Sequence, residues 1–587
     1  MPKKPKVLVV CGEAAGLMAA LQLIESGCEV EIISPVPIRR LLASTHTGLN
    51  AALNTKGEAD SPAHHLEDSL VAGDFLASQP ALQAMCAQAP ELIWILDRMG
   101  VPFTRTTEGQ IELHRAPGTT FSRTAFAGTT TGPAVLFALC EQIQRYEVEG
   151  TVTCHEGWEF LSAALDDTTC LGIVAMELVT LEVKVFAAQA VVIAAGGVGG
   201  IFGRTTNAVH VTGSVQGALF RQGVRYTNAE FIQLHPATVL GEDKFRAIPD
   251  LALAEGGRFW VPRTARDQRP PEEIPGAERW YFLEEHYPNL GNFVPRDIAT
   301  REIFEISLDG YGVGSLSQVY LDLTHLPPVR RQRRLGGIRD LYLQMVGEDV
   351  STVPMCVFPG MHLSLGGLWV DTEHQTNIKG LFAAGECASS LHGANALSGN
   401  ELLFSLFSGR TSGQAAARFA QGTIQLSVDS DSSLETERRR QTDSIEQLKA
   451  KRGSENAWRI QEKLGRLMTE QVTVVRFNER LQGALEQLDQ LEDRLARIDI
   501  NETNFWATPS IPHARRLESM LILARVIIVS ALNRNESRGV HFKPEFPTCN
   551  NTEYLKTTVA TFSETGPVIT FEPIDTSLIE PRPREYN

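Results

Sequence analysis

Three glycine-rich turns, each at the end of a short apolar run, are the residues whose chemistry is easiest to read from this sequence. The first turn, at residues 11–16 (CGEAAG), follows the apolar run 6–10 and precedes residues 17–26, whose apolar side chains have helical spacing. Small residues at the start of a helix let backbone N–H groups approach a phosphate. Because a second apolar run at 30–34 completes a strand–helix–strand unit, this segment predicts the beginning of a dinucleotide-binding fold.

Two later apolar runs, at residues 190–199 and 380–386, also end in glycines. Short continuous apolar runs are typical of buried parallel strands. Parallel strands of an open sheet present their C-terminal ends at one edge, and ligands bind at that edge. We therefore expect the three runs to be strands of one sheet whose glycine turns surround one ligand.

The elements that must position these turns fall into several segments. The predicted fold class is α/β, with a split Rossmann-like domain, an inserted α+β domain and a helical C-terminal domain. Residues 435–498 are dense in Glu, Arg, Gln and Leu, which indicates helices with solvated faces, and a partner surface is the alternative. Residues 543–587 carry six prolines and little periodicity, and they predict an extended surface tail. The predicted boundaries are 1–235 with 355–421, then 236–354, 422–542 and 543–587.

Composition and charge exclude several classes of function. The 587 residues carry a formal net charge of −16, which argues against binding the phosphate backbone of a nucleic acid. No apolar run is long enough to span a membrane, and the basic N-terminus lacks the pattern of a signal peptide. The nine cysteines form no CxxC pair, so no cluster or zinc site is predicted and a reducing cytoplasm is expected.

Several longer motifs resemble one family. They are NTKGEADSP at 54–62, GDFLASQP at 73–80, EFIQLHP at 230–236, VPRDIATR at 294–301, FPGMHLSLGG at 358–367 and ESRG at 536–539. Together they resemble the flavoprotein subunit of succinate dehydrogenase and fumarate reductase, most closely the bacterial type that has a diheme cytochrome b anchor. The resemblance covers nearly the whole chain.

The resemblance implies a cofactor, a reaction and partners. A family member binds FAD in the split domain, interconverts succinate and fumarate beneath the inserted capping domain, and passes electrons to an iron–sulfur subunit. That subunit joins a cytochrome b membrane anchor, so this chain would be cytoplasmic and peripheral on the inner face of the cell membrane, without inserting directly. The residues expected to contact FAD are Gly12, Gly16, Ser34, Gly196, Gly197, Gly385, Glu386 and Leu402.

The first glycine turn departs from the family pattern. The three glycine positions of G-x-G-x-x-G are Cys11, Glu13 and Gly16, so only the third glycine remains. Glu13 places a carboxyl group where a diphosphate is expected, although it could instead turn to solvent or cap the following helix. The family's flavin-linked histidine corresponds to Leu41 or Leu42, and His46 is interpreted as an ordinary loop residue. The resemblance therefore implies FAD that is bound noncovalently.

The residues that match the family's substrate site are Arg296, His235, His362 and Asp250. In the family, an arginine at the position of Arg296 delivers a proton, two histidines hold substrate carboxylates and an acid relays the proton. The alternative interpretation is that both histidines are structural and that Arg296 only pairs with Asp297 or another nearby acid.

Three further positions lack the family's residue. Leu253 and Ala396 stand where arginines are expected, and Glu401 replaces a serine beside the flavin. Losing the arginine at 396 removes a bidentate clamp on one substrate carboxylate. The sequence therefore predicts a succinate dehydrogenase or fumarate reductase flavoprotein subunit whose activity is uncertain. A catalytically impaired or silent paralogue with a scaffold role and a flavoenzyme with a changed substrate are the alternatives.

Overall fold

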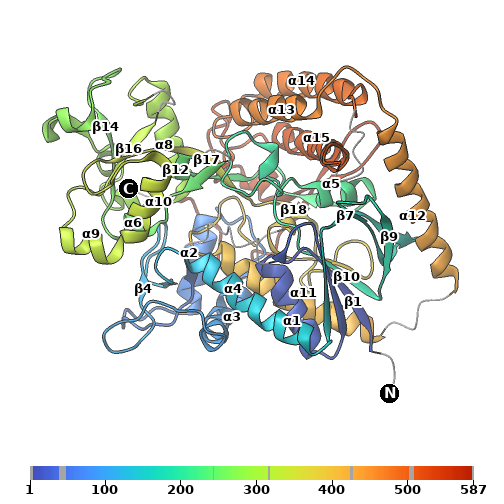
Figure 1. Cartoon of the computed structure of the whole chain (residues 1–587). Coiled ribbons are helices and arrows are strands. Elements are labelled where there is room, and N and C mark those ends of the chain that lie inside the picture. Colours follow the sequence, from blue (N-terminus) through green and yellow to red (C-terminus); the bar gives the residue numbers. More distant parts are fainter. Residues whose placement is uncertain are drawn as a thin grey trace.

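The computed structural model describes residues 4–38, 48–241, 244–314, 318–389, 391–422, 428–500 and 508–584. Its central sheet is parallel and has the strand order β19-β10-β1-β2-β6 (Figure 1). The strands are β1 (Lys6–Val10), β2 (Glu29–Ser34), β6 (Val152–Glu156), β10 (Ala190–Ile193) and β19 (Leu381–Ala383). The three apolar runs expected in one sheet are thus neighbouring strands, and the α/β fold class is confirmed.

Two helices pack closely together against this sheet. They are α1 (Ala14–Glu25) and α11 (Glu401–Gly422), and α4 (Thr131–Val148) packs beside α1. Glycines on α11 allow the approach, since a Cβ at Gly409 would overlap the carbonyl oxygen of Ala15 and one at Gly413 would lie 2.7 Å from the Ala19 oxygen. Because both helices begin at the same edge of the sheet, their first residues lie near each other.

The N-terminal part also contains a small antiparallel sheet with the order β3-β5-β4. Its strands are β3 (Leu49–Asn50), β4 (Leu113–His114) and β5 (Thr124–Ala125), and the helices α2 (Pro62–Ala72) and α3 (Gln79–Arg98) lie between β3 and β4 in the sequence. In the register of this sheet, His114 pairs with Thr124. A separate antiparallel sheet is formed by β7 (Trp158–Asp166), β8 (Thr169–Glu177) and β9 (Val183–Ala187).

The inserted segment forms a six-stranded antiparallel sheet, which lies at the upper left of Figure 1. In spatial order its strands are β13 (Phe245–Ala247), β12 (Ile232–Leu240), β17 (Met355–Ser364), β16 (Val319–Asp322), β14 (Arg258–Pro262) and β15 (Arg279–Trp280). The pairing of β12 with β17 shifts register between His235 and Thr238, which leaves His235 at an irregular point of the strand. Helix α8 (Arg296–Leu308) packs on β12, and α6 (Leu251–Ala254), α9 (Pro328–Arg334) and α10 (Gly336–Val346) complete this part.

Four long helices follow, as the charged and leucine-rich sequence predicts. They are α12 (Val428–Lys449), α13 (Ala457–Gln471), α14 (Asn478–Ala496) and α15 (Ser510–Asn533). Helix α15 packs against α5 (Ser214–Arg221), where a Cβ at Gly217 would lie 2.6 Å from the Ser519 Cβ. In the part of the chain that the structure describes, no helix combines the length and the apolar character needed to cross a membrane.

The C-terminal segment has more structure than the predicted surface tail. Strands β20 (Lys556–Thr561) and β21 (Val568–Pro573) form a hairpin, and β20 pairs with β11 (Tyr226–Thr227), which pairs in turn with β18 (Gly367–Leu368). Arg584 then donates to Asp297 at 2.7 Å. The prolines and the weak periodicity of this segment gave no indication of the hairpin. The strand that β20 pairs with, β11, lies hundreds of residues earlier in the sequence.

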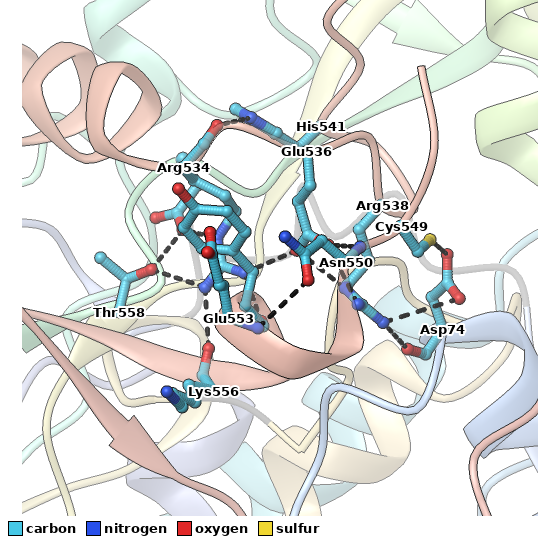
Figure 2. A network of polar contacts seen from close by, with 12 residues as sticks. Asp74, Arg534, Glu536, Arg538, His541, Cys549, Asn550, Glu553, Lys556 and Thr558 are labelled. Atoms are coloured by element: carbon cyan, nitrogen blue, oxygen red, sulfur yellow. Dashed lines mark hydrogen bonds and ion pairs between the residues drawn. The ribbon is translucent and has the colours of Figure 1, made fainter. Parts of the chain in front are cut away.

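A buried network of ion pairs fixes this segment to the rest of the molecule (Figure 2). Arg534 donates to Glu230 at 2.6 Å and to Glu536 at 2.8 Å, and all three side chains have no exposed surface. Arg538 donates to the same Glu536 at 2.9 Å and to the carbonyl oxygen of Asp74 at 2.9 Å. Since Glu230 lies two residues before β12, the network sets the position of the strand that carries His235.

Candidate active site

A cavity that is partly open to solvent lies at the C-terminal edge of the central sheet. Its lining comes from the start of α1, the residues after β10 and β19, and the start of α11. Of the predicted cofactor residues, Gly196, Gly385, Glu386 and Leu402 line it, together with Glu13. This is the position at which open α/β sheets bind their ligands.

Glycines allow close packing of the turns beside this cavity. A Cβ at Gly16 would overlap the Cys11 carbonyl oxygen, and one at Gly197 would overlap the Glu386 carboxyl group. Gly12 is buried in the same turn as Cys11, whose φ of 75° lies in the left-handed region that favours glycine. The turn therefore keeps the path of a glycine-rich dinucleotide loop although its first glycine is replaced.

Of the other predicted cofactor residues, Gly12, Gly16, Gly197 and Ser34 are not among those that line the cavity. Ser34 ends β2, but it is not among the residues that line the cavity, and its hydroxyl donates to the Val36 carbonyl oxygen at 2.6 Å. Leu41 and Leu42, the positions predicted to lack a flavin link, lie outside the described residues, as does His46.

Glu13 points into the cavity. It makes no capping hydrogen bond to α1, and its carboxyl oxygens lie 3.2 and 3.3 Å from where a Cβ of Gly196 would be. Burial, with a smaller contribution from Glu386, raises the pKa of Glu13 to about 7. Burial also raises the pKa of Glu386 to about 7, against hydrogen bonds from Ser364. Near neutral pH both carboxyl groups therefore change charge readily, and a protonated Glu13 can lie beside a phosphate without repelling it.

The polar groups of the cavity lining fit a flavin dinucleotide. Two buried polar atoms of lining residues, Asn207 Oδ1 and His210 Nε2, have no hydrogen-bond partner among the described residues. Buried polar atoms in proteins are normally hydrogen-bonded, so these atoms indicate a polar ligand. Glu13 is the one misfit, and protonation removes its charge.

A smaller pocket adjoins the cavity, because His362 and Glu401 line both. All four residues predicted from the family's substrate site lie here: Arg296, His235, His362 and Asp250. They come from α8, β12, β17 and the turn before α6. The fold thus brings together residues that are up to 127 positions apart in the sequence.

Arg296 is the centre of the smaller pocket. Its guanidinium donates to Asp250 at 2.6 Å and to Ser398 at 3.2 Å, and it forms an ion pair with Glu401. Burial alone would raise the pKa of Asp250, but the charge of Arg296 together with the contacts from His235 and Ser398 outweighs burial and holds that pKa well below its usual range. Asp297 takes no part in these contacts, since it binds Asn395 and Arg584 instead. The acids that pair with Arg296 are Asp250 and Glu401, and Asp297 is not one of them.

The two predicted histidines face each other across the pocket, with ring centroids 5.2 Å apart. His235 Nδ1 accepts a hydrogen bond from the Ala237 N–H at 3.2 Å, which leaves the proton on Nε2, 3.3 Å from an Asp250 oxygen. His362 Nδ1 lies 2.9 Å from the Thr206 hydroxyl. Burial, followed by the charge of Arg296, lowers the pKa of His235, so this ring is neutral at physiological pH.

The positions that lack family arginines have become part of the apolar core. Leu253 is buried in α6, and Ala396 lies in a small cluster with Leu76, Phe231 and Leu363. Among the described residues that line the smaller pocket, Arg296 is the sole lysine or arginine. One cation thus faces two carboxylates in a largely enclosed space.

Sequence reasoning missed two groups of this pocket. Ser398 forms a hydrogen bond with Asp250, and its place within the motif 395–402 could have indicated it. His114 also lines the pocket, yet its position between β3 and β5 in sequence gave no signal. Only the pairing of β4 with β5 brings His114 to this place.

Comparisons with known proteins agree with this geometry. The family model described as an FAD binding domain matches residues 6–402, and the one described as the fumarate reductase flavoprotein C-terminus matches residues 461–586. The chain therefore has an FAD-binding domain, which defines its class as a flavoprotein.

Relatives that match nearly the whole chain identify the family within this class of flavoproteins. The succinate dehydrogenase flavoprotein subunit of Bacillus subtilis is 45% identical over 587 residues, covering 99% of this chain and 98% of the relative. The fumarate reductase flavoprotein subunit of Haemophilus influenzae is 28% identical and covers 99% and 96%. The structure of FrdA from E. coli quinol fumarate reductase superposes with a TM-score of 0.90 at 26% identity, covering 99% and 98%. This chain belongs to the family of succinate dehydrogenase and fumarate reductase flavoprotein subunits.

Proposed function

We propose that the chain binds FAD noncovalently in the larger cavity and interconverts succinate and fumarate in the smaller pocket. The observation that carries this proposal is the buried group of Arg296, Asp250 and His235 at the junction of the two cavities. A proton donor held between an acid and a cofactor cavity is what the reduction of a carbon–carbon double bond requires.

The residues proposed to hold FAD are those that predict the dinucleotide site: Gly12, Gly16, Ser34, Gly196, Gly197, Gly385, Glu386 and Leu402. FAD supplies the site that gains or loses a hydride. The chain's own residues supply the rest of the chemistry. Arg296 donates an Nη proton to the substrate, and a proton from solvent then reaches Arg296 through Asp250, while His235 and His362 orient a carboxylate. The shared lining residues His362 and Glu401 bring the reacting carbon next to the cofactor cavity.

The partners follow from the relatives. Two of the solved structures that this fold matches are named a quinol fumarate reductase and the Mycobacterium smegmatis Sdh1 complex with a quinone. We propose that this chain likewise passes electrons to an iron–sulfur subunit, which a cytochrome b anchor holds at the membrane. The flavoprotein would then lie at the inner face of the cell membrane through its partners.

Absorbance of the purified chain tests cofactor binding and its mode. We expect a yellow protein with a flavin spectrum, and acid precipitation should release all the colour into the supernatant. Colour that stays in the pellet would contradict noncovalent binding, and a folded but colourless chain that takes up no added FAD would contradict the function.

Activity is then measured as fumarate reduction with a reduced viologen. Because Ala396 removes a carboxylate clamp, Ala396→Arg should raise kcat/KM for fumarate at least tenfold. Gly422→Ala serves as the control, since its Cβ would meet no neighbour. If both variants leave fumarate unreduced while FAD is bound, the fumarate reaction is wrong, and a changed substrate or a silent scaffold becomes the better interpretation.

A further inference from the structure

His114 is a polar group of the smaller pocket that the proposed mechanism does not use. It ends β4 and is buried, with 6% of its surface exposed, and its ring packs edge-on against Phe126 with centroids 5.0 Å apart. It lines the same pocket as Arg296 and His235. A buried imidazole in a binding pocket normally has partners for both ring nitrogens.

The two nitrogens of His114 differ. Nδ1 lies 3.2 Å from the carbonyl oxygen of Arg115, and since a carbonyl only accepts, this nitrogen carries a proton. Nε2 is buried and has no hydrogen-bond partner among the described residues. In the neutral ring Nε2 is therefore an acceptor without a donor, and in the protonated ring it is a donor without an acceptor.

The charges around the pocket determine whether a ligand meets the neutral or the protonated form of His114. Arg296 is balanced by Asp250 and Glu401, so these three groups together carry a net charge of −1. A dicarboxylate that enters this pocket adds two negative charges, and the clamping arginine is replaced by Ala396. A further cation is needed, and the imidazole of His114 is the lining group with an open nitrogen that can become one.

The free ring is neutral for a physical reason. Burial lowers the pKa of His114, with a small contribution from Lys56, while Asp250 and Glu255 act in the opposite direction. A carboxylate against Nε2 would add to the effect of those two acids and favour the imidazolium. Ligand binding and protonation of this ring are therefore coupled.

We propose that His114 is a substrate-binding residue, which takes up a proton as a dicarboxylate enters and donates a charged hydrogen bond from Nε2 to one of its carboxylates. This inference rests on the proposed function, because it assigns a second carboxylate contact in the same pocket. It also gives the pocket a cation in place of the arginine that the family has at the position of Ala396. Orientation of the carboxylate by His235 and His362 is unchanged.

Titration calorimetry of the FAD-loaded chain with fumarate tests the proposal. The titration is repeated at pH 7.5 in buffers of different ionisation enthalpy, because the dependence of the heat on the buffer counts the protons taken up. We expect uptake of about one proton per fumarate by the unmodified chain. His114→Gln keeps an amide donor, so it should bind fumarate about tenfold more weakly and take up no proton, and His114→Leu should weaken binding about a hundredfold.

Two controls separate this result from a loss of structure. His155→Gln changes a histidine on β6 that is not part of the pocket lining, and it should keep both the affinity and the proton uptake. Circular dichroism melts of each variant report folding. Tight fumarate binding with unchanged proton uptake in His114→Gln would overturn the inference alone, whereas no fumarate binding by the unmodified chain would overturn the proposed function with it.

Discussion

At the scale of single residues, the site contains two acids that the family pattern does not have, Glu13 and Glu401. Glu401 meets Arg296 directly, so its charge is neutralised within the protein. No cation among the described residues pairs with Glu13, and burial shifts its pKa upward. The same kind of substitution thus has two outcomes, which depend on whether an arginine lies within reach.

The raised pKa of Glu13 predicts a pH-dependent stability. The pKa is about 7 in the folded chain against 4.5 in the unfolded one, so the stabilising contribution is complete below pH 4.5 and is lost as pH rises through 7. Replacing Glu13 by Gln removes the titrating carboxyl group and its effect on stability. For the FAD-free chain, the free energy of unfolding measured in urea should decrease when the pH is raised from 5 to 8. In Glu13→Gln this decrease should be smaller by about 2 kcal/mol.

Glu25→Gln is the matched control, because Glu25 ends the same helix on its exposed side. It should reproduce the pH profile of the unmodified chain. Identical profiles for Glu13→Gln and the unmodified chain would show that Glu13 does not titrate in this range.

At the scale of elements, the contact of α1 with α11 determines where Glu13 and Glu401 lie. Gly409→Ala would push the helices apart, since its Cβ overlaps the carbonyl oxygen of Ala15. Overpacking of this kind costs about 1–3 kcal/mol. We expect a lower thermal midpoint and weaker FAD retention on gel filtration. Gly422→Ala, at the end of the same helix, should change neither, and equal melting of the two variants would contradict the close packing.

The buried network around Arg534 is a second element-scale determinant. Glu230→Gln leaves the buried guanidinium short of one carboxylate, which should cost about 3 kcal/mol of stability. Chemical denaturation measures this loss. Glu67→Gln breaks an exposed pair with Arg582, and it should cost less than about 1 kcal/mol. Similar losses in the two variants would mean that burial of the network contributes nothing.

At the scale of the whole molecule, the sequence predicted features that rest on local patterns. The strands at 6–10, 190–193 and 381–383 were predicted because each combines an apolar run with a glycine turn. The hairpin of β20 and β21 was missed because its partner strand β11 is more than 300 residues away. Periodicity reports on neighbouring residues and carries little information about such pairs.

For the candidate site, too, sequence motifs predicted some residues, and contacts between distant segments were missed. Family motifs identified Arg296, Asp250, His235 and His362, and the structure places all four in one pocket. The ion pair between Arg296 and Glu401 could not be read from the sequence, since it depends on how α8 and α11 meet in space. His114 carried no motif at all. Predicting these contacts required the packing of separate domains as well as the type of each residue.

The contacts of the C-terminal segment also set an order of events in the cell. A chain emerges from the ribosome N-terminus first, so residues 74, 230 and 297 are made well before their partners at 534–584. Until those partners emerge, Glu230 lacks its arginine and β11 has β18 but not β20 as a neighbouring strand. The ion pairs that hold the strand carrying His235 therefore form only after almost the whole chain has been synthesised.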